Sequence, residues 1–299
     1  MSSAEFVSIA SDTLRAVIHP LGAELWSITD TQGREYMTDA DPVFWTSHAP
    51  LLFPIVGGLV DDTLRVDGQE YMMKRHGFAR RNTFELVAHE AAEARFRLTD
   101  SAETRAVYPF AFVLEMVFRL EGSTLVMEAT VSNPGPGELP FSFGYHPAFA
   151  WPLPGGDGSD ADKAAHKLVF AAEEPQPVRR VTPGTGLLLP AGERTPVEGR
   201  ELMLSESLFT ADAMIWTDLA SRSLSYGAEG GAWLDVAFPD TCALGLWQVP
   251  GARYVCIEPW AGHSDPVGFA GDIREKPGMV ILAPGASHRV RMDVTVREA

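Results

Sequence analysis

The amino-acid sequence predicts an all-β protein built as a large antiparallel sandwich. Hydrophobic and polar residues alternate with a period of two along several segments, which is the pattern of a strand that buries one face. No segment keeps the period of an amphipathic helix over a convincing length, so we expect few and short helices. The 27 glycines and 22 prolines are spread along the chain, as is typical of many short strands joined by turns.

The expected strands follow one another from the N-terminus. Four short segments rich in β-forming residues come first: 5–9, 13–18, 84–87 and 94–98. The clearest signal is a hairpin, in which apolar residues alternate along 113–120 and again along 125–132. Gly122 and Ser123 lie between the two runs and predict the turn. A last alternating strand is expected over 290–296.

One segment departs from this rhythm. Residues 152–200 hold seven prolines and seven glycines, a composition that favours a long irregular excursion with little fixed structure. The sequence contains no internal repeat and no convincing domain boundary. We therefore expect residues 1–299 to form a single domain.

The charge balance excludes some classes of partner. Lys and Arg together number 24 and Asp and Glu 40, which gives a formal net charge of −16. Such a chain repels phosphate backbones and anionic lipids, so neither nucleic acid nor a membrane is an expected partner. The sequence does not predict the oligomeric state.

The apolar segments and cysteines favour a cytoplasmic location. The longest apolar stretch, 49–60, is interrupted by prolines and falls short of the roughly 18 residues that span a membrane. No apolar leader precedes the first strand. Cys242 and Cys256 lie in apolar runs without metal-binding spacing, so we expect two buried free thiols in a reducing compartment.

Three polar residues stand in unexpected surroundings. His76 is followed by glycine and flanked by Arg75 and Arg80 in an electropositive bend, which on its own is typical of a surface loop. His146 lies in a run of aromatic residues, where a structural core histidine is the alternative. Glu258 ends an apolar strand just before Pro-Trp. A buried carboxylate without a partner costs several kcal/mol, so a carboxylate in such company usually has a function.

Two histidines and a glutamate fit two kinds of chemistry. They form an acid/base set beside aromatic rings that suit the apolar faces of a sugar. They also match a metal site with two histidines and one carboxylate, although no short ligand spacing is present. The spacing along the chain does not decide between the two.

Five motifs, taken in order, resemble the aldose 1-epimerases (galactose mutarotases), and in particular their LacX-like branch. The motifs are Gly22-Ala23-Glu24-Leu25, Leu52-Phe53-Pro54-Ile55-Val56-Gly57, His76-Gly77-Phe78-Ala79-Arg80, Gly144-Tyr145-His146-Pro147-Ala148-Phe149 and Cys256-Ile257-Glu258-Pro259-Trp260. The resemblance runs from about residue 7 to residue 296. It implies a galactose mutarotase-like β-supersandwich, an isomerase activity on a free aldose, and no cofactor or metal.

The resemblance also implies roles for the three polar residues. Glu258 matches the general base that acts on the C1 hydroxyl, and His146 matches the general acid that protonates the ring oxygen. His76 matches a histidine that hydrogen-bonds near the ring oxygen. We expect the three side chains to converge on one open pocket. Opening a hemiacetal needs one group to take a proton and one to give a proton, which these residue types can do without a metal.

Further residues are candidates for binding the substrate: Arg80, Arg75, Gln248 and Asp265. Relatives often carry arginine where this chain has Gly58, so the identity of the sugar stays open, and Arg75 is the first candidate to replace that arginine. Two alternatives remain: a sugar-binding protein without significant turnover, and a phosphosugar 1-epimerase. A phosphosugar 1-epimerase would need several arginines that converge on the phosphate. The cluster of arginines at 75–81 is the one feature of the sequence that favours it.

Overall fold

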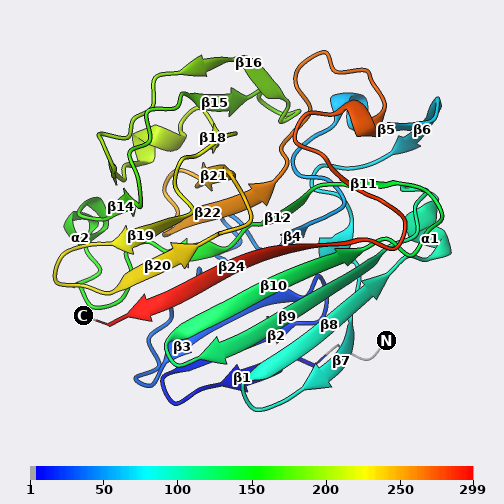
Figure 1. Ribbon diagram of the computed structural model, residues 1–299. Helices are drawn as coiled ribbons and strands as arrows, with labels where there is room; N and C mark the ends of the chain where they lie inside the picture. Colours follow the sequence, from blue (N-terminus) through cyan, green and yellow to red (C-terminus); the bar gives the residue numbers. More distant parts are fainter. Residues whose placement is uncertain (1–4, 299) are drawn as a thin grey trace.

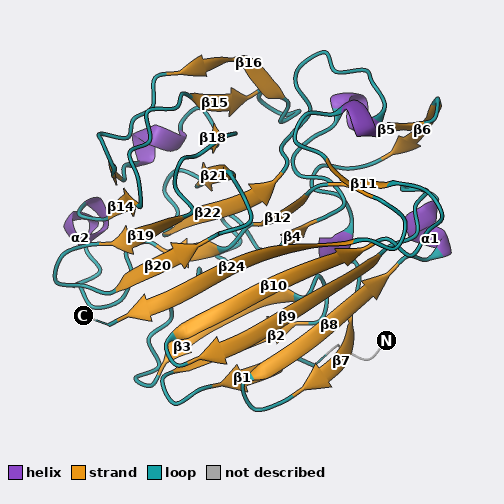
Figure 2. Cartoon of the chain, in the orientation of Figure 1, coloured by secondary structure: helices purple, strands orange, loops and turns teal. Residues whose placement is uncertain are grey.

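The computed structural model describes residues 5–298, and in this part of the chain every pairing between extended strands is antiparallel (Figures 1 and 2). The largest sheet has nine strands in the spatial order β17 (Glu201–Met203), β14 (Lys167–Phe170), β19 (Ser223–Gly227), β20 (Trp233–Ala237), β24 (Ser287–Arg297), β10 (Thr124–Ser132), β9 (Val113–Glu121), β8 (Glu93–Thr99) and β7 (Glu85–His89).

A second large sheet has eight strands. Its order is β16 (Leu188–Glu193), β15 (Val178–Val181), β18 (Met214–Trp216), β21 (Ala243–Trp247), β22 (Tyr254–Ala261), β12 (Phe143–Tyr145) and β4 (Leu51–Leu52), with β13 (Ala148–Ala150) paired to β22. Three smaller sheets are formed by β1 (Val7–Ala10), β2 (Leu14–His19) and β3 (Glu24–Asp30), by β5 (Thr63–Val66) with β6 (Gln69–Met72), and by β11 (Leu139–Phe141) with β23 (Val280–Leu282).

Helices are few and short in the described residues, as the sequence predicts. The two α-helices are α1 (Ala102–Arg105) and α2 (Asp160–Ala164). Single 3-10 turns are η1 (Val60–Asp62), η2 (Ala79–Arg81), η3 (Glu206–Phe209) and η4 (Ile273–Glu275). No helix within residues 5–298 is long and apolar enough to cross a membrane.

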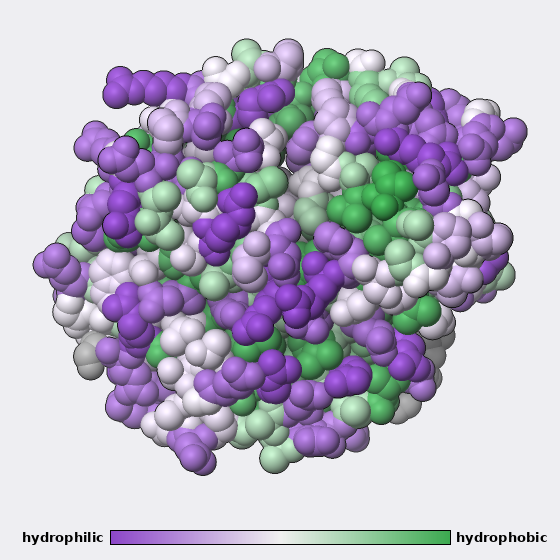
Figure 3. Space-filling view, in the orientation of Figure 1, coloured by the Kyte–Doolittle hydropathy of each residue, from purple (hydrophilic) through white to green (hydrophobic). Residues whose placement is uncertain are grey.

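The alternation in the sequence becomes the two faces of the nine-stranded sheet. Met127 of β10 pairs with Phe118 of β9 on one side and with Met292 of β24 on the other, and all three side chains are buried. Their neighbours along each strand point to the opposite face, where hydrophilic residues are widespread (Figure 3). The predicted hairpin and the predicted C-terminal strand are therefore confirmed.

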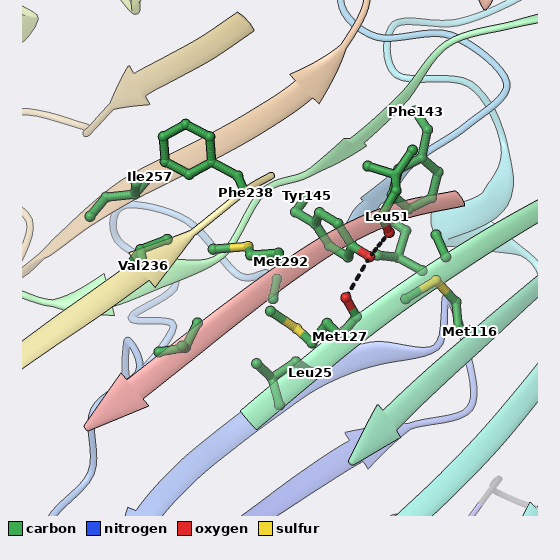
Figure 4. Close-up of a cluster of buried hydrophobic side chains, with 14 of the residues drawn as sticks. Leu25, Leu51, Met116, Met127, Phe143, Tyr145, Val236, Phe238, Ile257 and Met292 are labelled. Carbon is green, nitrogen blue, oxygen red and sulfur yellow. Dashed lines mark hydrogen bonds between the residues drawn. The ribbon is translucent and has the colours of Figure 1, made fainter. Parts of the chain in front are cut away.

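The buried face of this sheet packs against the eight-stranded and three-stranded sheets. Tyr145 of β12 inserts between the layers, close to Leu25 of β3 and Met127 of β10 (Figure 4). Its hydroxyl oxygen lies 2.8 Å from the carbonyl oxygen of Val290 and 3.1 Å from that of Met127, so its one proton is shared between two adjacent strands. Tyr145 thus connects the two large sheets by a polar contact inside an apolar core.

The prediction of an irregular excursion over residues 152–200 is wrong. This segment contains α2, begun by Ser159, whose hydroxyl accepts the N–H of Asp162, and it contributes β14, β15 and β16 to the two large sheets. These strands are only four to six residues long, and β16 itself contains a proline and a glycine. Such short strands do not show a recognisable alternation.

The two cysteines are free thiols, but only one is buried as predicted. Cys256 lies inside the protein, whereas Cys242 is half-exposed because it lies in the turn before β21. The apolar run around Cys242 is therefore a poor guide to the burial of this residue.

Replacing Tyr145 with Phe tests the contact between the sheets. The change removes one hydroxyl and leaves the ring in place, so we expect a loss of about 1–2 kcal/mol in the free energy of unfolding. The measurement is urea denaturation followed by circular dichroism, and the control is Tyr71→Phe on the half-buried β5–β6 hairpin. Equal stabilities of the two variants would contradict the proposed contribution of this contact.

Candidate active site

His146 is oriented by the period of β12. The side chains of Phe143 and Tyr145 point into the core between the sheets, whereas a Cβ on Gly144 would point to the opposite face. His146, directly after the strand, continues this alternation and lines a cavity on that opposite face. The anchoring of Tyr145 in the core therefore sets the position of His146.

Glu258 is placed in the same way by β22. Val255 and Ile257 belong to the main core, whereas Glu258 and Trp260 line the cavity. A Cβ on Gly144 or on Gly245, in the strands on either side, would lie 2.5 Å or 2.6 Å from the Trp260 indole. These two glycines let the indole lie on the sheet and form the floor of the cavity.

His146 and Glu258 form a buried pair. His146 Nε2 lies 3.2 Å from Glu258 Oε2, and the two side chains are 9% and 2% exposed. Burial raises the pKa of Glu258 well above its usual value, and the nearby charge of Asp212 raises it further. Burial lowers the pKa of His146 to about 3. Both shifts disfavour the charged forms, so burial favours a protonated Glu258 and a neutral His146.

His76 is held in the cavity wall by a reciprocal contact with Gly57. The His76 N–H donates to Gly57 O at 2.9 Å, and the Gly57 N–H donates to His76 Nδ1 at 3.1 Å. Because Nδ1 accepts a hydrogen bond, the proton of the neutral ring is on Nε2. Burial lowers the pKa of His76, and the charges of His146 and the neighbouring arginines lower it further. His76 is therefore a neutral donor, and its ring centroid lies 5.9 Å from that of His146.

Glycine at position 57 is required for this arrangement. Gly57 has φ 74, in the left-handed region, and a Cβ there would collide with Ser264. His76 also has a positive φ of 66, which is uncommon for a residue with a side chain and indicates a conformation held by its surroundings.

These residues line one open cavity, which we call the central cavity, with a volume of about 410 Å³. Its wall is largely aromatic: the ring of Trp45 lies 5.0 Å from that of His146 and 5.4 Å from that of Trp247. The volume lies within the usual range for small-molecule sites. The sequence analysis assigned neither Trp45 nor Trp247 to the site.

Asp212 is a further cavity residue that the sequence analysis missed. It lines the central cavity and has φ 67 at the end of the loop before β18. Its carboxylate accepts its neighbour Ala213's N–H at 2.8 Å, and Arg180 donates to its carbonyl oxygen at 3.0 Å. An acidic residue in a loop is too common a signal to reveal this position from the sequence.

Arg75 and Arg80 both lie in the wall of the central cavity. Arg75 Nη2 donates to Gly184 O at 2.6 Å, and Arg80 Nη2 donates to Arg75 O at 3.0 Å. The bend around His76 has a sequence that, on its own, is typical of a surface loop. In the structure it is a half-buried part of the cavity wall.

Gln248 and Asp265 do not line this cavity. Gln248 is buried, and its Nε2 donates to Ala252 O at 2.8 Å. Asp265 is buried beside Lys276, with 3.3 Å between Oδ1 and Nζ, and it accepts the N–H of Val60 at 3.0 Å. The contacts of both residues are with the protein itself, so their expected role in binding has no support from their positions.

Gly58 faces a loop formed by residues 182–187. A Cβ on Gly58 would lie 2.5 Å from the carbonyl oxygen of Thr185 in this loop. An arginine at position 58 would therefore force the loop to move. The loop and Arg75 together occupy this side of the cavity, where relatives are expected to place that arginine.

Three ligand atoms lie close enough to hold a metal ion, but they are not the three that the sequence suggests. His146, Cys256 and Glu258 place one donor atom each within 4.8 Å of one another, and His76 is not part of the group found among residues 5–298. Burial raises the pKa of the Cys256 thiol, and the Glu258 charge raises it further. A neutral thiol buried beside Glu258 is a poor metal ligand.

The arrangement suits proton transfer to and from a small polyol. A proton donor and a proton acceptor lie side by side in a cavity with aromatic walls, and a second histidine offers a fixed N–H. Aromatic faces contact the apolar side of such a molecule, while Asp212 and the arginines can bind its hydroxyl groups.

Comparisons with known proteins agree with this geometry. A family model described as aldose 1-epimerase matches residues 5–295. Protein LacX of Lactococcus lactis subsp. lactis, in its plasmid and chromosomal forms, is 31% identical over 97% of this chain and 99% of LacX.

Solved structures with the same fold cover almost the whole chain. A galactose mutarotase related enzyme from Lactobacillus acidophilus has a TM-score of 0.89 and 31% identity, over 98% of each chain. A galactose mutarotase-like protein from Lactobacillus casei ATCC 334 has a TM-score of 0.88 and 26% identity, over 98% of this chain and 100% of that one. The predicted galactose mutarotase-like β-supersandwich is confirmed, and the chain belongs to the aldose 1-epimerase family.

Proposed function

We propose that the protein interconverts the α and β anomers of an aldose by opening and closing its ring. The observation that carries this proposal is the buried His146–Glu258 pair, which places an acid and a base side by side at the floor of an open cavity. In the proposed resting state, the pair holds one exchangeable proton. Family membership supports a sugar isomerase. The residues of the site supply the proton transfers that this reaction needs.

In the proposed reaction, Glu258 takes the proton of the C1 hydroxyl. The C1–O bond of the ring breaks, its electron pair goes to the ring oxygen, and that oxygen takes a proton from His146. The product is the open aldehyde, which rotates about C1–C2 and closes by the reverse steps. His76 donates its Nε2–H to the ring oxygen and stabilises the charge that develops there.

The shifted pKa values set the energetic cost of this division of roles, because the reactive form needs an ionised Glu258 and a protonated His146, and burial favours the neutral form of each. An ionised carboxylate with a raised pKa is a stronger base, and an imidazolium with a lowered pKa is a stronger acid. Ring opening leaves Glu258 protonated and His146 neutral, which is the state that burial favours. The energetic demand of burying two charges is thus relieved as the ring opens.

A second function, sugar binding without significant turnover, would use the same cavity. Gly58 favours this alternative, because relatives often carry a sugar-binding arginine at that position. The two functions differ in whether the His146–Glu258 pair transfers protons, so variants of the pair separate them.

Glu258→Gln removes the base and keeps the size of the side chain. We expect anomer exchange to fall by about 10²-fold or more, with sugar affinity largely retained. His146→Asn should lose activity similarly, because it removes the acid. The measurement is NMR exchange spectroscopy over a panel of aldoses.

Glu201→Gln, at an exposed ion pair with Lys167, is the matched control for these variants. Wild-type exchange rates in Glu258→Gln would remove the assigned base. Sugar binding by a wild-type protein that accelerates no anomer exchange would favour the alternative function.

The pH dependence tests the one-proton pair. Lowering the pH adds a second proton only near the lowered pKa of His146, which is about 3, so at pH 5 only about one pair in a hundred is affected. We therefore expect kcat/KM to stay constant from pH 7 to pH 5 and to fall on the alkaline side, where the pair loses its proton. Circular dichroism at each pH verifies folding. An acid limb centred near pH 6.5 would mean that His146 titrates like an exposed histidine.

Metal removal should leave the activity unchanged, because ring opening needs proton transfer and no Lewis acid. The measurement compares anomer exchange before and after dialysis against a chelator, with metal content determined by mass spectrometry. Stoichiometric zinc or iron, together with loss of activity on chelation, would instead support a metal site at His146, Cys256 and Glu258.

A further inference from the structure

A second cavity, which we call the side cavity, adjoins the central cavity. Its volume is about 610 Å³, and its charged lining consists of Lys74, Arg75, Arg80, Arg81, Asp61 and Asp62. Arg75 and Arg80 line both cavities, so these two residues lie at the boundary between them.

The three arginines of the side cavity have no acidic partner among residues 5–298. None of them lies within 4.0 Å of a carboxylate, although the chain carries 40 acidic residues. The contacts recorded for Arg75 and Arg80 are with carbonyl oxygens. Burial lowers the pKa of Arg80, and the charges of Arg81 and Arg75 lower it further. The three guanidinium groups therefore lie close together.

The nearby acids are already engaged or exposed. Asp62 binds Lys74 at 2.6 Å, at the outer part of the side cavity, and Asp61 beside it is exposed. Glu24 is the acidic residue whose charge raises the pKa of Arg80. Its carboxylate already accepts hydrogen bonds from the N–H groups of His48 and Ala49, at 2.7 Å and 3.0 Å. Four cationic and two acidic side chains line the side cavity, so its lining keeps an excess of positive charge in a chain whose net charge is −16.

The 182–187 loop holds Arg75 in this position. The guanidinium lies against Gly186, where a Cβ would be 2.5 Å from Cζ, and it donates to Gly184 O at 2.6 Å. Gly186 has φ 69, in the left-handed region that favours glycine, and a side chain there would displace the guanidinium. The loop is thus shaped to receive a guanidinium and to present it between the two cavities.

We infer that the substrate is a sugar with an anionic group, phosphate or carboxylate, on a carbon away from C1. The ring occupies the central cavity above His146 and Glu258, and the anionic group enters the side cavity, where Arg75, Arg80 and Arg81 bind it. Guanidinium groups suit both anions because each can donate two parallel hydrogen bonds. This inference rests on the proposed function and narrows its substrate class.

The test compares neutral and anionic sugars in one assay. NMR exchange gives kcat/KM for glucose and galactose, for their 6-phosphates, and for glucuronate and galacturonate. We expect kcat/KM for one class of anionic sugar, either the 6-phosphates or the uronates, to exceed kcat/KM for the neutral sugars by at least tenfold. High salt should reduce this ratio, because it screens the attraction between the anion and the arginines. A preference for the 6-phosphates identifies phosphate as the group, and a preference for the uronates identifies carboxylate.

Arg81→Gln tests the side cavity directly, because Arg81 lines the side cavity and is absent from the lining of the central one. It should lower the ratio of anionic to neutral kcat/KM by about tenfold. The control is Arg95→Gln, at an exposed ion pair with Glu93 on the nine-stranded sheet, which should leave the ratio unchanged. A ratio unaffected by Arg81→Gln would overturn the assignment of the anion to the side cavity.

Calorimetry with Glu258→Gln separates this inference from the proposed function. If the wild-type protein turns over neutral sugars as fast as every anionic sugar, the inference is overturned and the proposed function stays intact. Binding of galactose 6-phosphate or galacturonate, but not galactose, in the absence of any turnover by the wild type would support the inference and overturn the proposed function. No binding of either anionic sugar would overturn the inference.

Discussion

The hydroxyl of Tyr145 joins the two large sheets, because it lies within hydrogen-bonding distance of carbonyl groups on two neighbouring strands of the facing sheet. Because side chains alternate along β12, fixing Tyr145 in the core commits the next residue, His146, to the opposite face. The partner strand β22 follows the same rule and brings Glu258 to that face. The reactive pair is therefore a geometric result of how the sandwich is joined.

The same sandwich makes the pair costly to ionise. Glu258 and His146 lie where water has little access, so a charge on either side chain is unfavourable. His76 avoids this cost because the Gly57 N–H fixes it as a neutral donor. Charge on the substrate side is confined to Asp212 and the arginines at the cavity wall.

The sequence alone predicts those parts of the fold that rest on long, regular patterns. The hairpin of β9 and β10 and the strand β24 bury every second residue over nine or more positions, and their alternation is visible. The strands within residues 152–200 are too short for that. The position of Asp212 depends on a left-handed backbone conformation, and the contact of Arg75 with Gly184 joins residues 109 positions apart. No local pattern encodes either, and the expectation of a single domain stays a prediction.

The two glycines beneath Trp260 also set the depth of the cavity. A methyl group at Gly144 or Gly245 would raise the indole into the space above the floor and would leave the acid and base groups of His146 and Glu258 unaltered. The space open to a ligand and the reactivity of the buried pair are thus controlled by different residues.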